Sequence, residues 1–276
     1  MVNNKKQAIG IFDSGVGGLT VFKEIRKQFP SEDIIYFGDT ARVPYGPKSP
    51  NTVLEYSIQN ARFLIQNNVK VIVIACNTST SVALDVLRKL FNVPVIGVIE
   101  PGSKKAVNVS KNNRIGVIGT EGTIKSKAYR KTISKMKKDS IIFEKSCPLF
   151  VSLAEEGWEN HEVASIVTKE YLSEIVKNEI DTLVLGCTHY PILKDTIQKF
   201  VGKKITLVDS AVEISKSLKE IINNDQNTNV NGENYFYVSD NENKFKKLAS
   251  RILGEKIELV QKVYLGESWF LKNNEG

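Results

Sequence analysis

Two cysteines stand at matching places in the two halves of the chain. Cys76 ends the apolar run Val-Ile-Val-Ile-Ala, and Cys187 ends the run Leu-Val-Leu-Gly. Each run is typical of a buried strand, and polar turn residues follow it, Asn-Thr in one case and Thr-His in the other. One such cysteine is often only a small buried apolar side chain. Two in corresponding positions favour a pair of acid/base groups facing one pocket, where one thiolate removes a proton from a carbon and the opposite thiol returns one to its other face.

A glycine-rich segment near the N-terminus offers a second chemical feature. The sequence Asp13-Ser14-Gly-Val-Gly-Gly-Leu closes a predicted strand and opens a predicted helix. Its glycines permit close backbone approach, and free N–H groups at a helix start attract anions. It lacks the Lys of a Walker loop and the spacing of the dinucleotide fingerprint. We interpret it as a carboxylate-binding loop to which Ser14 supplies a hydroxyl, and a turn required only for packing is the alternative.

Two further segments carry polar residues, and each can be interpreted as functional or as purely structural. The loop 37–46 is dense in Gly, Pro and Tyr, so it could cover a cleft or be an ordinary surface connection. His189 follows Cys187 by two residues and could lie beside its thiol, or be a hydrogen-bonded histidine near a helix start. A zinc site is weakly supported, because no Cys-x-x-Cys pair accompanies these residues, and we expect no metal. Cys147, which precedes Pro148, is assigned to structure.

Composition bounds the class of protein. A chain of 276 residues with 41% hydrophobic residues can bury full cores and suits two domains. Three scattered cysteines suit a reducing compartment, no apolar run approaches the length of a membrane span, and the N-terminus is polar, so we expect a cytoplasmic protein. The net charge of +7 comes from dispersed lysines without interleaved aromatics. This pattern does not favour nucleic acid as a partner, but it would attract a small anion.

The elements that must position these residues alternate between strand and helix, which predicts an α/β fold with largely parallel sheets. Predicted strands cover 8–12, 34–37, 69–75, 95–98, 114–118, 140–144, 182–186, 205–209 and 235–238. Helices are predicted to fill the gaps between these strands, and the clearest cover 18–28, 52–66, 80–90, 123–137, 162–177, 211–222 and 242–253. The polar segment 223–234 is predicted to be a surface loop.

The two halves of the sequence resemble one another. The segment Ile9-Gly-Ile-Phe-Asp13-Ser14 aligns with Ile115-Gly-Val-Ile-Gly119-Thr120, and the two cysteine strands align at nearly the same offset. This internal repeat predicts two similar, pseudo-symmetric domains. Ligands of open α/β sheets bind beyond the carboxyl ends of the strands. We therefore expect the active site in a cleft between the two domains.

Taken together, the motifs resemble those of glutamate racemases, cofactor-independent enzymes that make D-glutamate for bacterial cell walls. The resemblance runs through most of the chain. It is carried by Gly10-Ile-Phe-Asp13-Ser14-Gly-Val-Gly-Gly-Leu-Thr, Tyr36-Phe-Gly-Asp39-Thr, Val43-Pro-Tyr45-Gly46, Ala75-Cys76-Asn77-Thr78, Cys147-Pro-Leu-Phe and Leu185-Gly-Cys187-Thr188-His189-Tyr-Pro. Aspartate racemases share the two-thiol plan but resemble the chain less closely around Asp13 and Tyr45-Gly46.

The resemblance implies an architecture and a set of site residues. Residues 1–98 with 210–276 would form one discontinuous α/β domain and residues 99–209 the other, and two subunits would pair as a homodimer. Cys76 and Cys187 would be the catalytic bases, with Asp13 supporting the first and His189 the second. Substrate would be bound by Asp13, Ser14, Tyr45, Gly46, Asn77, Thr78, Thr120, Thr188 and His189, with Glu155 as a further candidate. Ser152 departs from the family pattern of Pro and a larger apolar residue, which leaves the role of Glu155 open.

The implied activity is racemisation of L-glutamate without PLP or another cofactor. A racemase for aspartate or another acidic amino acid is the nearest alternative. A small-anion binding protein with two structural cysteines is the alternative outside enzymes.

Overall fold

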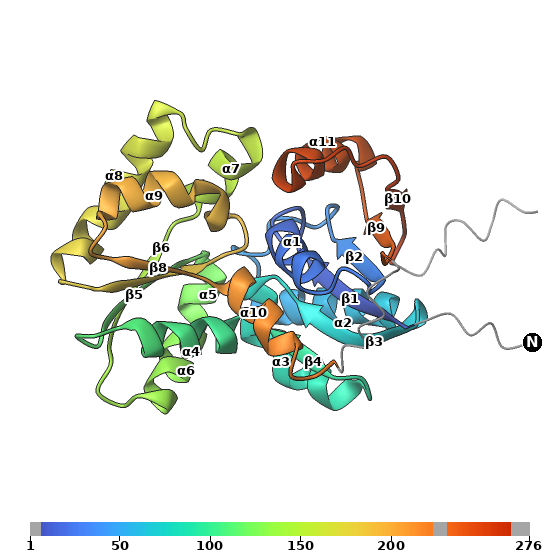
Figure 1. The fold of residues 1–276 in the computed structure, drawn as a ribbon, viewed down its shortest axis with the longest axis horizontal. Coiled ribbons are helices and arrows are strands. Elements are labelled where there is room, and N and C mark those ends of the chain that lie inside the picture. The colour runs from blue at the N-terminus through green and yellow to red at the C-terminus, as the bar shows by residue number, and fades with distance from the viewer. Residues whose placement is uncertain (1–6, 223–230, 266–276) are drawn as a thin grey trace, which may run out of the picture.

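The computed structural model describes residues 7–222 and 231–265, and most of the predicted loop 223–234 lies outside them. Two parallel sheets organise the chain (Figure 1). The six-stranded sheet has the order β10-β9-β2-β1-β3-β4. Its strands are β1 (Ala8–Asp13), β2 (Ile34–Gly38), β3 (Val69–Ile74), β4 (Val95–Gly97), β9 (Asn234–Val238) and β10 (Gln261–Lys262). The four-stranded sheet has the order β6-β5-β7-β8. Its strands are β5 (Arg114–Gly119), β6 (Ile141–Ser146), β7 (Thr182–Gly186) and β8 (Thr206–Asp209).

The two sheets repeat one topology. The order β2-β1-β3-β4 corresponds strand for strand to β6-β5-β7-β8, and every pairing between described strands is parallel. The predicted α/β fold with two pseudo-symmetric halves is thereby confirmed. In Figure 1, β9 beside β2 shows how the end of the chain returns to complete the first sheet.

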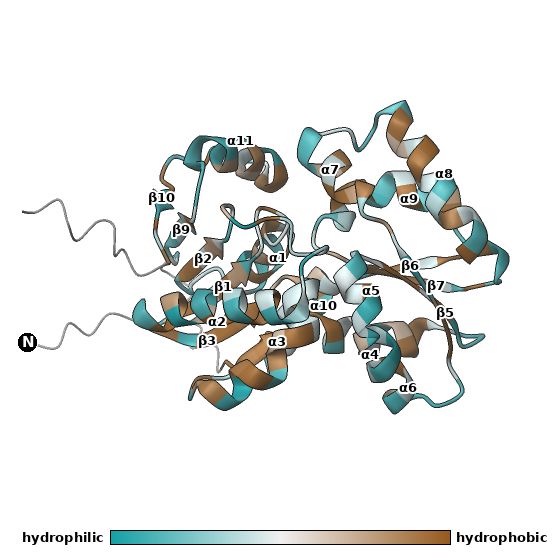
Figure 2. Cartoon of the chain, turned by 180° about the vertical axis from the view of Figure 1, so that it is seen from behind, coloured by the Kyte–Doolittle hydropathy of each residue, from teal (hydrophilic) through white to brown (hydrophobic). Residues whose placement is uncertain are grey.

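Helices cover both faces of each sheet, because successive side chains of a strand point to opposite faces and both sets are apolar. One face of the first sheet is covered by α1 (Leu19–Gln28), α10 (Ser210–Leu218) and α11 (Glu242–Leu253), and the other by α2 (Pro50–Gln66) and α3 (Asn77–Leu90). The second sheet lies between α4 (Ile99–Val109) with α6 (Ala128–Met136) on one face and α7 (Leu149–Glu156), α8 (Glu162–Lys177) and α9 (Lys194–Val201) on the other. Figure 2 shows apolar residues concentrated in the strands and hydrophilic ones on outer helical turns.

Some predicted elements differ from the observed ones. The predicted helix 123–137 is two helices, α5 (Glu121–Ser126) and α6, because Lys127 between them adopts a left-handed conformation with φ of 55°. Three further helices, α4, α7 and α9, lie in gaps between strands, where the sequence predicts helix without giving its bounds. In α4, Pro101 lies in the first turn, where no intrahelical N–H is needed. Within the described residues, no helix is long and apolar enough to cross a membrane.

Candidate active site

One cavity of about 40 Å³ between the two halves brings most of the predicted site residues together. Its lining includes the predicted residues Ser14, Tyr45, Gly46, Cys76, Asn77, Thr78, Thr120, Cys187, Thr188 and His189, and also Val43, Pro44, Val151 and Glu155. Both thiols therefore border the same space, and each comes from the end of a corresponding strand, β3 or β7. Asp13 does not border the cavity and is fully buried behind it.

Cys76 is the N-cap of α3, which begins at Asn77, three residues earlier than the sequence predicted. Its Sγ accepts the N–H of Ser79 at 3.5 Å, and its S–H donates to Ser14 Oγ at 3.8 Å. A helix N-terminus favours negative charge on sulfur. Burial and the nearby Asp13 carboxylate outweigh this effect and raise the pKa of Cys76 to about 12. Cys76 is therefore a protonated thiol at neutral pH, in the form that donates a proton.

Asp13, at the end of β1, connects the surroundings of the two thiols. Its Oδ2 accepts the N–H of Gly15 at 3.0 Å, and its Oδ1 accepts the hydroxyl of Thr188 at 3.4 Å. Burial raises the pKa of this carboxyl, and His189 opposes the shift. The carboxyl thus lies between the loop that carries Ser14 and the segment that carries His189.

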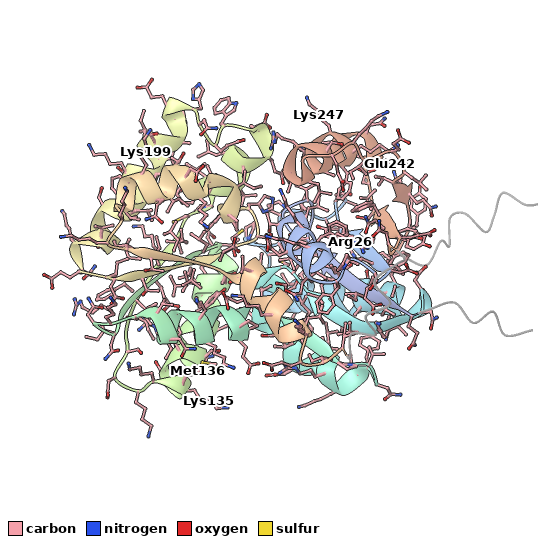
Figure 3. The ribbon with its side chains drawn as sticks, viewed as in Figure 1. Arg26, Lys135, Met136, Lys199, Glu242 and Lys247 are labelled. Atoms are coloured by element: carbon pink, nitrogen blue, oxygen red, sulfur yellow. The ribbon has the colours of Figure 1, made fainter. Side chains whose placement is uncertain are left out.

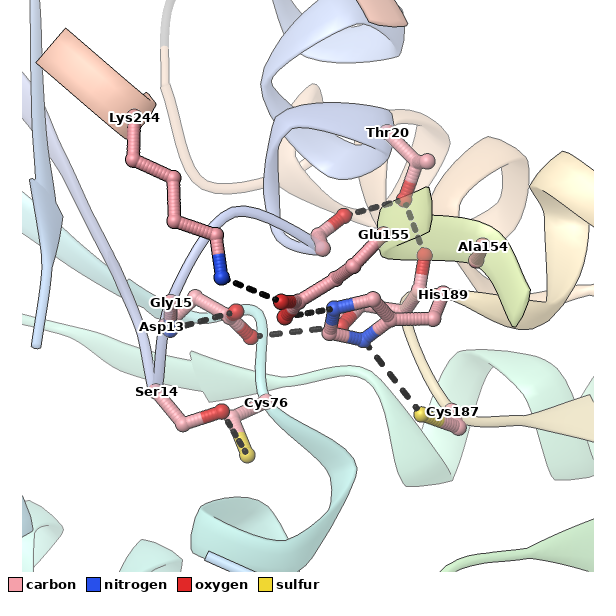
Figure 4. A network of polar contacts seen from close by, with 12 residues as sticks. Asp13, Ser14, Gly15, Thr20, Cys76, Ala154, Glu155, Cys187, His189 and Lys244 are labelled. Carbon is pink, nitrogen blue, oxygen red and sulfur yellow. Dashed lines mark hydrogen bonds and ion pairs between the residues drawn. The ribbon is translucent and has the colours of Figure 1, made fainter. Parts of the chain in front are cut away.

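Cys187 begins a chain of polar contacts, shown in Figure 4. Its Sγ lies 3.8 Å from His189 Nδ1, and Nε2 of this ring lies 3.3 Å from Glu155 Oε1. Lys244, on α11, places its Nζ 3.4 Å from Glu155 Oε2. Burial acts to lower the pKa of His189, but Cys187, Glu155 and Asp13 together raise it to about 10. The imidazole is therefore cationic at neutral pH and favours negative charge on the adjacent sulfur.

The glycine loop packs against the His189 segment. A Cβ on Gly17 would lie 2.5 Å from His189 Nδ1, closer than real Cβ contacts come. Thr20, at the start of α1, donates to the carbonyl oxygens of Thr188 and Gly17 at 3.0 and 2.9 Å. The glycines therefore permit a close approach between the two halves. The predicted carboxylate-binding role of this loop stays a prediction.

Hydroxyl and amide groups from both halves form the rest of the cavity wall. Thr78 Oγ1 and Thr120 Oγ1 lie 2.8 Å apart across the cavity. Asn77 Oδ1 accepts the hydroxyl of Tyr129 at 2.9 Å. The Tyr45 hydroxyl donates to Asp39 and accepts the amide of Asn60 at 3.1 Å. Hydrogen bonds thus fix these groups before any ligand binds.

Sequence reasoning missed two groups that hold the site. Tyr129 and Lys244 come from α6 and α11, far along the chain from the residues they contact, and neither lies in a recognisable motif. Ser152 is exposed, so its departure from the family pattern does not displace Glu155 from the cavity. Cys147 lies in the apolar core of the second half. Among the described residues, no group of three or more His, Cys, Asp or Glu side chains is placed to hold a metal ion.

Comparisons with known proteins place the chain in a family. The model of the family Asp/Glu/Hydantoin racemase matches residues 9–215. A glutamate racemase of Geobacter metallireducens is 50% identical over 262 residues, which cover 94% of this chain and 97% of that protein. One from a Sulfurihydrogenibium species is 54% identical over 256 residues, with 91% and 97% covered.

Solved structures show the same likeness. The glutamate racemase RacE1 of Bacillus anthracis superposes with a TM-score of 0.91 at 39% identity, covering 95% of this chain and 99% of that one. The enzyme of Francisella tularensis, solved with D-glutamate, has a TM-score of 0.88 at 41% identity, covering 95% and 99%. An aspartate racemase homologue from Pyrococcus horikoshii, at 19% identity and a TM-score of 0.56, shares the fold alone.

The two-sheet fold and these matches define the class of protein as an isomerase that acts as a racemase. The chain belongs to the Asp/Glu/Hydantoin racemase family. The resemblance to glutamate racemases, as opposed to a small-anion binding protein, is thereby confirmed.

Proposed function

We propose that the protein interconverts L- and D-glutamate, with Cys76 and Cys187 as its two acid/base groups. The observation that carries the proposal is that both sulfurs border one cavity, from opposite halves of the molecule. Relatives that share half of the residues over nearly the whole chain are glutamate racemases, and one similar structure contains D-glutamate.

The reaction needs two proton transfers at Cα. One sulfur, as thiolate, takes the α-proton, so the Cα–H bond breaks, an S–H bond forms, and the electron pair stays on the substrate. The opposite thiol then gives its proton to the other face of Cα. The described structure suits this pattern, with Cys76 protonated and a cationic His189 beside Cys187. The reverse direction exchanges the two roles.

Proton transfer by a positioned group contributes about 10²- to 10⁴-fold, which is less than removal of an α-amino proton requires. Hydrogen-bond donors aimed at the substrate carboxylate must stabilise the charge that it takes up. The hydroxyls of Ser14, Thr78 and Thr120 and the amide of Asn77 border the cavity and can serve this purpose. Exclusion of water from so small a space strengthens each of these interactions.

The proposal extends to the protein's setting. D-glutamate made in the cytoplasm would supply peptidoglycan synthesis. The polypeptide would form two domains, 1–98 with 210–276 and 99–209, in line with the strands of each sheet. Two subunits would form a homodimer, which the mass in solution tests by light scattering.

The activity is tested by incubating purified protein with L-glutamate or L-aspartate and following optical rotation. We expect L-glutamate to lose its rotation and L-aspartate to retain it, whereas turnover of aspartate alone would support the alternative substrate. Cys76→Ala and Cys187→Ala should each lower turnover at least about 10²-fold. Cys147→Ala is the matched control, because this cysteine is buried away from the cavity, and it should remain active. Substantial turnover by either of the first two variants would reject the two-base scheme.

A further inference from the structure

Two cations of α11 contact the end of α7 across the boundary between the halves. Helix α11 packs in the core of the first sheet, whereas α7 packs in that of the second. Arg251 donates to the carbonyl oxygens of Ala154 and of Glu155, the latter at 3.1 Å. Carbonyls at a helix C-terminus carry partial negative charge, so a cation is stabilising there. Gly157, which ends α7 with φ of +76°, leaves room for the guanidinium, since a Cβ at this position would overlap it.

Lys244 lies seven residues before Arg251, on the same face of α11. Its amine contacts Glu155 Oε2, while Oε1 of the same carboxylate contacts His189, whose other nitrogen faces Cys187. The contacts therefore run without a gap from the surface of one half to the buried sulfur of the other (Figure 4). The contacts of Cys76, by comparison, are to Ser14 and Ser79 of its own half.

We propose that Lys244 is a positioning residue for proton transfer at Cys187, an inference that rests on the proposed racemase function. The Glu155 carboxylate must hold Nε2 of the imidazole so that Nδ1 faces the sulfur, and Lys244 fixes the free oxygen of that carboxylate. The ion pair with His189, and to a smaller extent the charge of Lys244, lower the pKa of Glu155, which keeps this carboxylate ionised. Lys244 does not border the cavity, so it acts on the sulfur only through this chain of contacts.

The first test compares Lys244→Gln with Lys247→Gln. Lys247 projects from the outer surface of the same helix (Figure 3), so its replacement makes the same change in charge without touching Glu155. The Lys244 side chain is 58% exposed, so its ion pair is worth little, and we expect Lys244→Gln to lower kcat about two- to fivefold with KM nearly unchanged. Lys247→Gln should match the wild type, and Lys244→Arg should retain most of the activity.

The second test asks whether the loss lies at one sulfur. Glutamate deuterated at Cα presents its deuteron to Cys187 in one enantiomer and to Cys76 in the other. Slower transfer at Cys187 should raise the isotope effect for the first enantiomer. The same slower transfer should lower the isotope effect for the second enantiomer. Its deuteron is removed by Cys76 before Cys187 delivers a proton, so removal of the deuteron limits the rate less. A general loosening of the structure would not shift the two isotope effects in opposite directions.

The third test is a double variant. In a Glu155→Gln background, Lys244→Gln should cause no further loss, because the two residues act through one contact. Additive losses, isotope effects that move together, or a Lys244→Gln variant indistinguishable from Lys247→Gln would each overturn the positioning role. Absence of glutamate racemisation by the wild-type protein would instead overturn the proposed function itself.

Discussion

At the residue scale, the two thiols have unequal surroundings. Cys76 has a buried carboxyl and a serine hydroxyl nearby, whereas Cys187 has a cationic imidazole. The Cys76 thiol is therefore protonated at neutral pH, and the sulfur of Cys187 lies beside a positive charge. This inequality follows from charges that the fold places around each sulfur, because both cysteines follow a buried apolar strand.

The cationic state of His189 predicts how stability depends on pH. Its pKa rises from the usual 6.5 to about 10 in the folded protein, so its stabilising contribution is complete below pH 6.5 and is lost as pH rises toward 10. Between pH 7 and 9 we expect the free energy of unfolding to fall by up to about 1.4 kcal/mol per pH unit. Urea titrations of wild type and His189→Gln measure this slope. Cys76 has an ordinary pKa of 9.0, at the upper end of this window, but it is present in both proteins, so its contribution cancels in the comparison. An equal slope in the variant would show that His189 is neutral.

Ten of the predicted site residues border the cavity. They could be predicted because strand ends and loop motifs are local features of the sequence. The sequence did not predict two residues that contact the site residues, and the reason is physical. Tyr129 and Lys244 reach their partners through the packing of whole helices, which no local pattern encodes.

At the element scale, the turn between β1 and α1 is shaped by close packing. Gly17 lies against Thr188 and His189, which leave no room for a side chain. Among the helices, the bounds of α4 and α9 were not predicted, because Pro101 and Pro191 stand at or just before their first turns. The strands, with their long apolar runs, were predicted to within two residues at most ends.

Gly17→Ala should therefore displace His189 from Cys187. We expect a loss of kcat of about tenfold or more, since small displacements of catalytic groups are costly. Gly15→Ala is the milder comparison, because its Cβ would meet only Cγ1 of Val43, a half-exposed side chain that can turn away. Steady-state kinetics measure kcat of both variants. Equal values would contradict the proposal that Gly17 allows His189 to lie beside Cys187.

At the scale of the whole molecule, the repeated topology delivers matching strand ends to one cavity. That space is only about 40 Å³, enough for a few water molecules, since one needs roughly 10–15 Å³. Glutamate is larger, so the halves or the loops between them must separate to admit it. The Thr78 to Thr120 contact and the hydrogen bond from Gly122 N–H to Gly46 carbonyl, at 2.9 Å, join the two halves beside this space, and a separation of the halves would break them.

This opening predicts that kcat/KM of the wild type falls as sucrose raises the viscosity of the solution. In His189→Gln the proton transfers are slower and limit the rate, so viscosity should have little effect on this variant. Initial rates measured over a range of sucrose concentrations compare kcat/KM of the two proteins. If viscosity lowered kcat/KM equally in the wild type and in His189→Gln, opening would not be the step that limits the wild type, and the prediction would be wrong.

The central claim is that two opposed sulfurs exchange the proton at one carbon, and labelling in heavy water tests it most directly. L-glutamate should be incubated in D₂O and stopped after a small fraction has reacted, followed by mass analysis of each separated enantiomer. We predict that the D-glutamate formed carries one deuterium at Cα while the remaining L-glutamate carries almost none. D-glutamate that retains the original proton would mean that a single group returns what it removed, and it would contradict the two-thiol account.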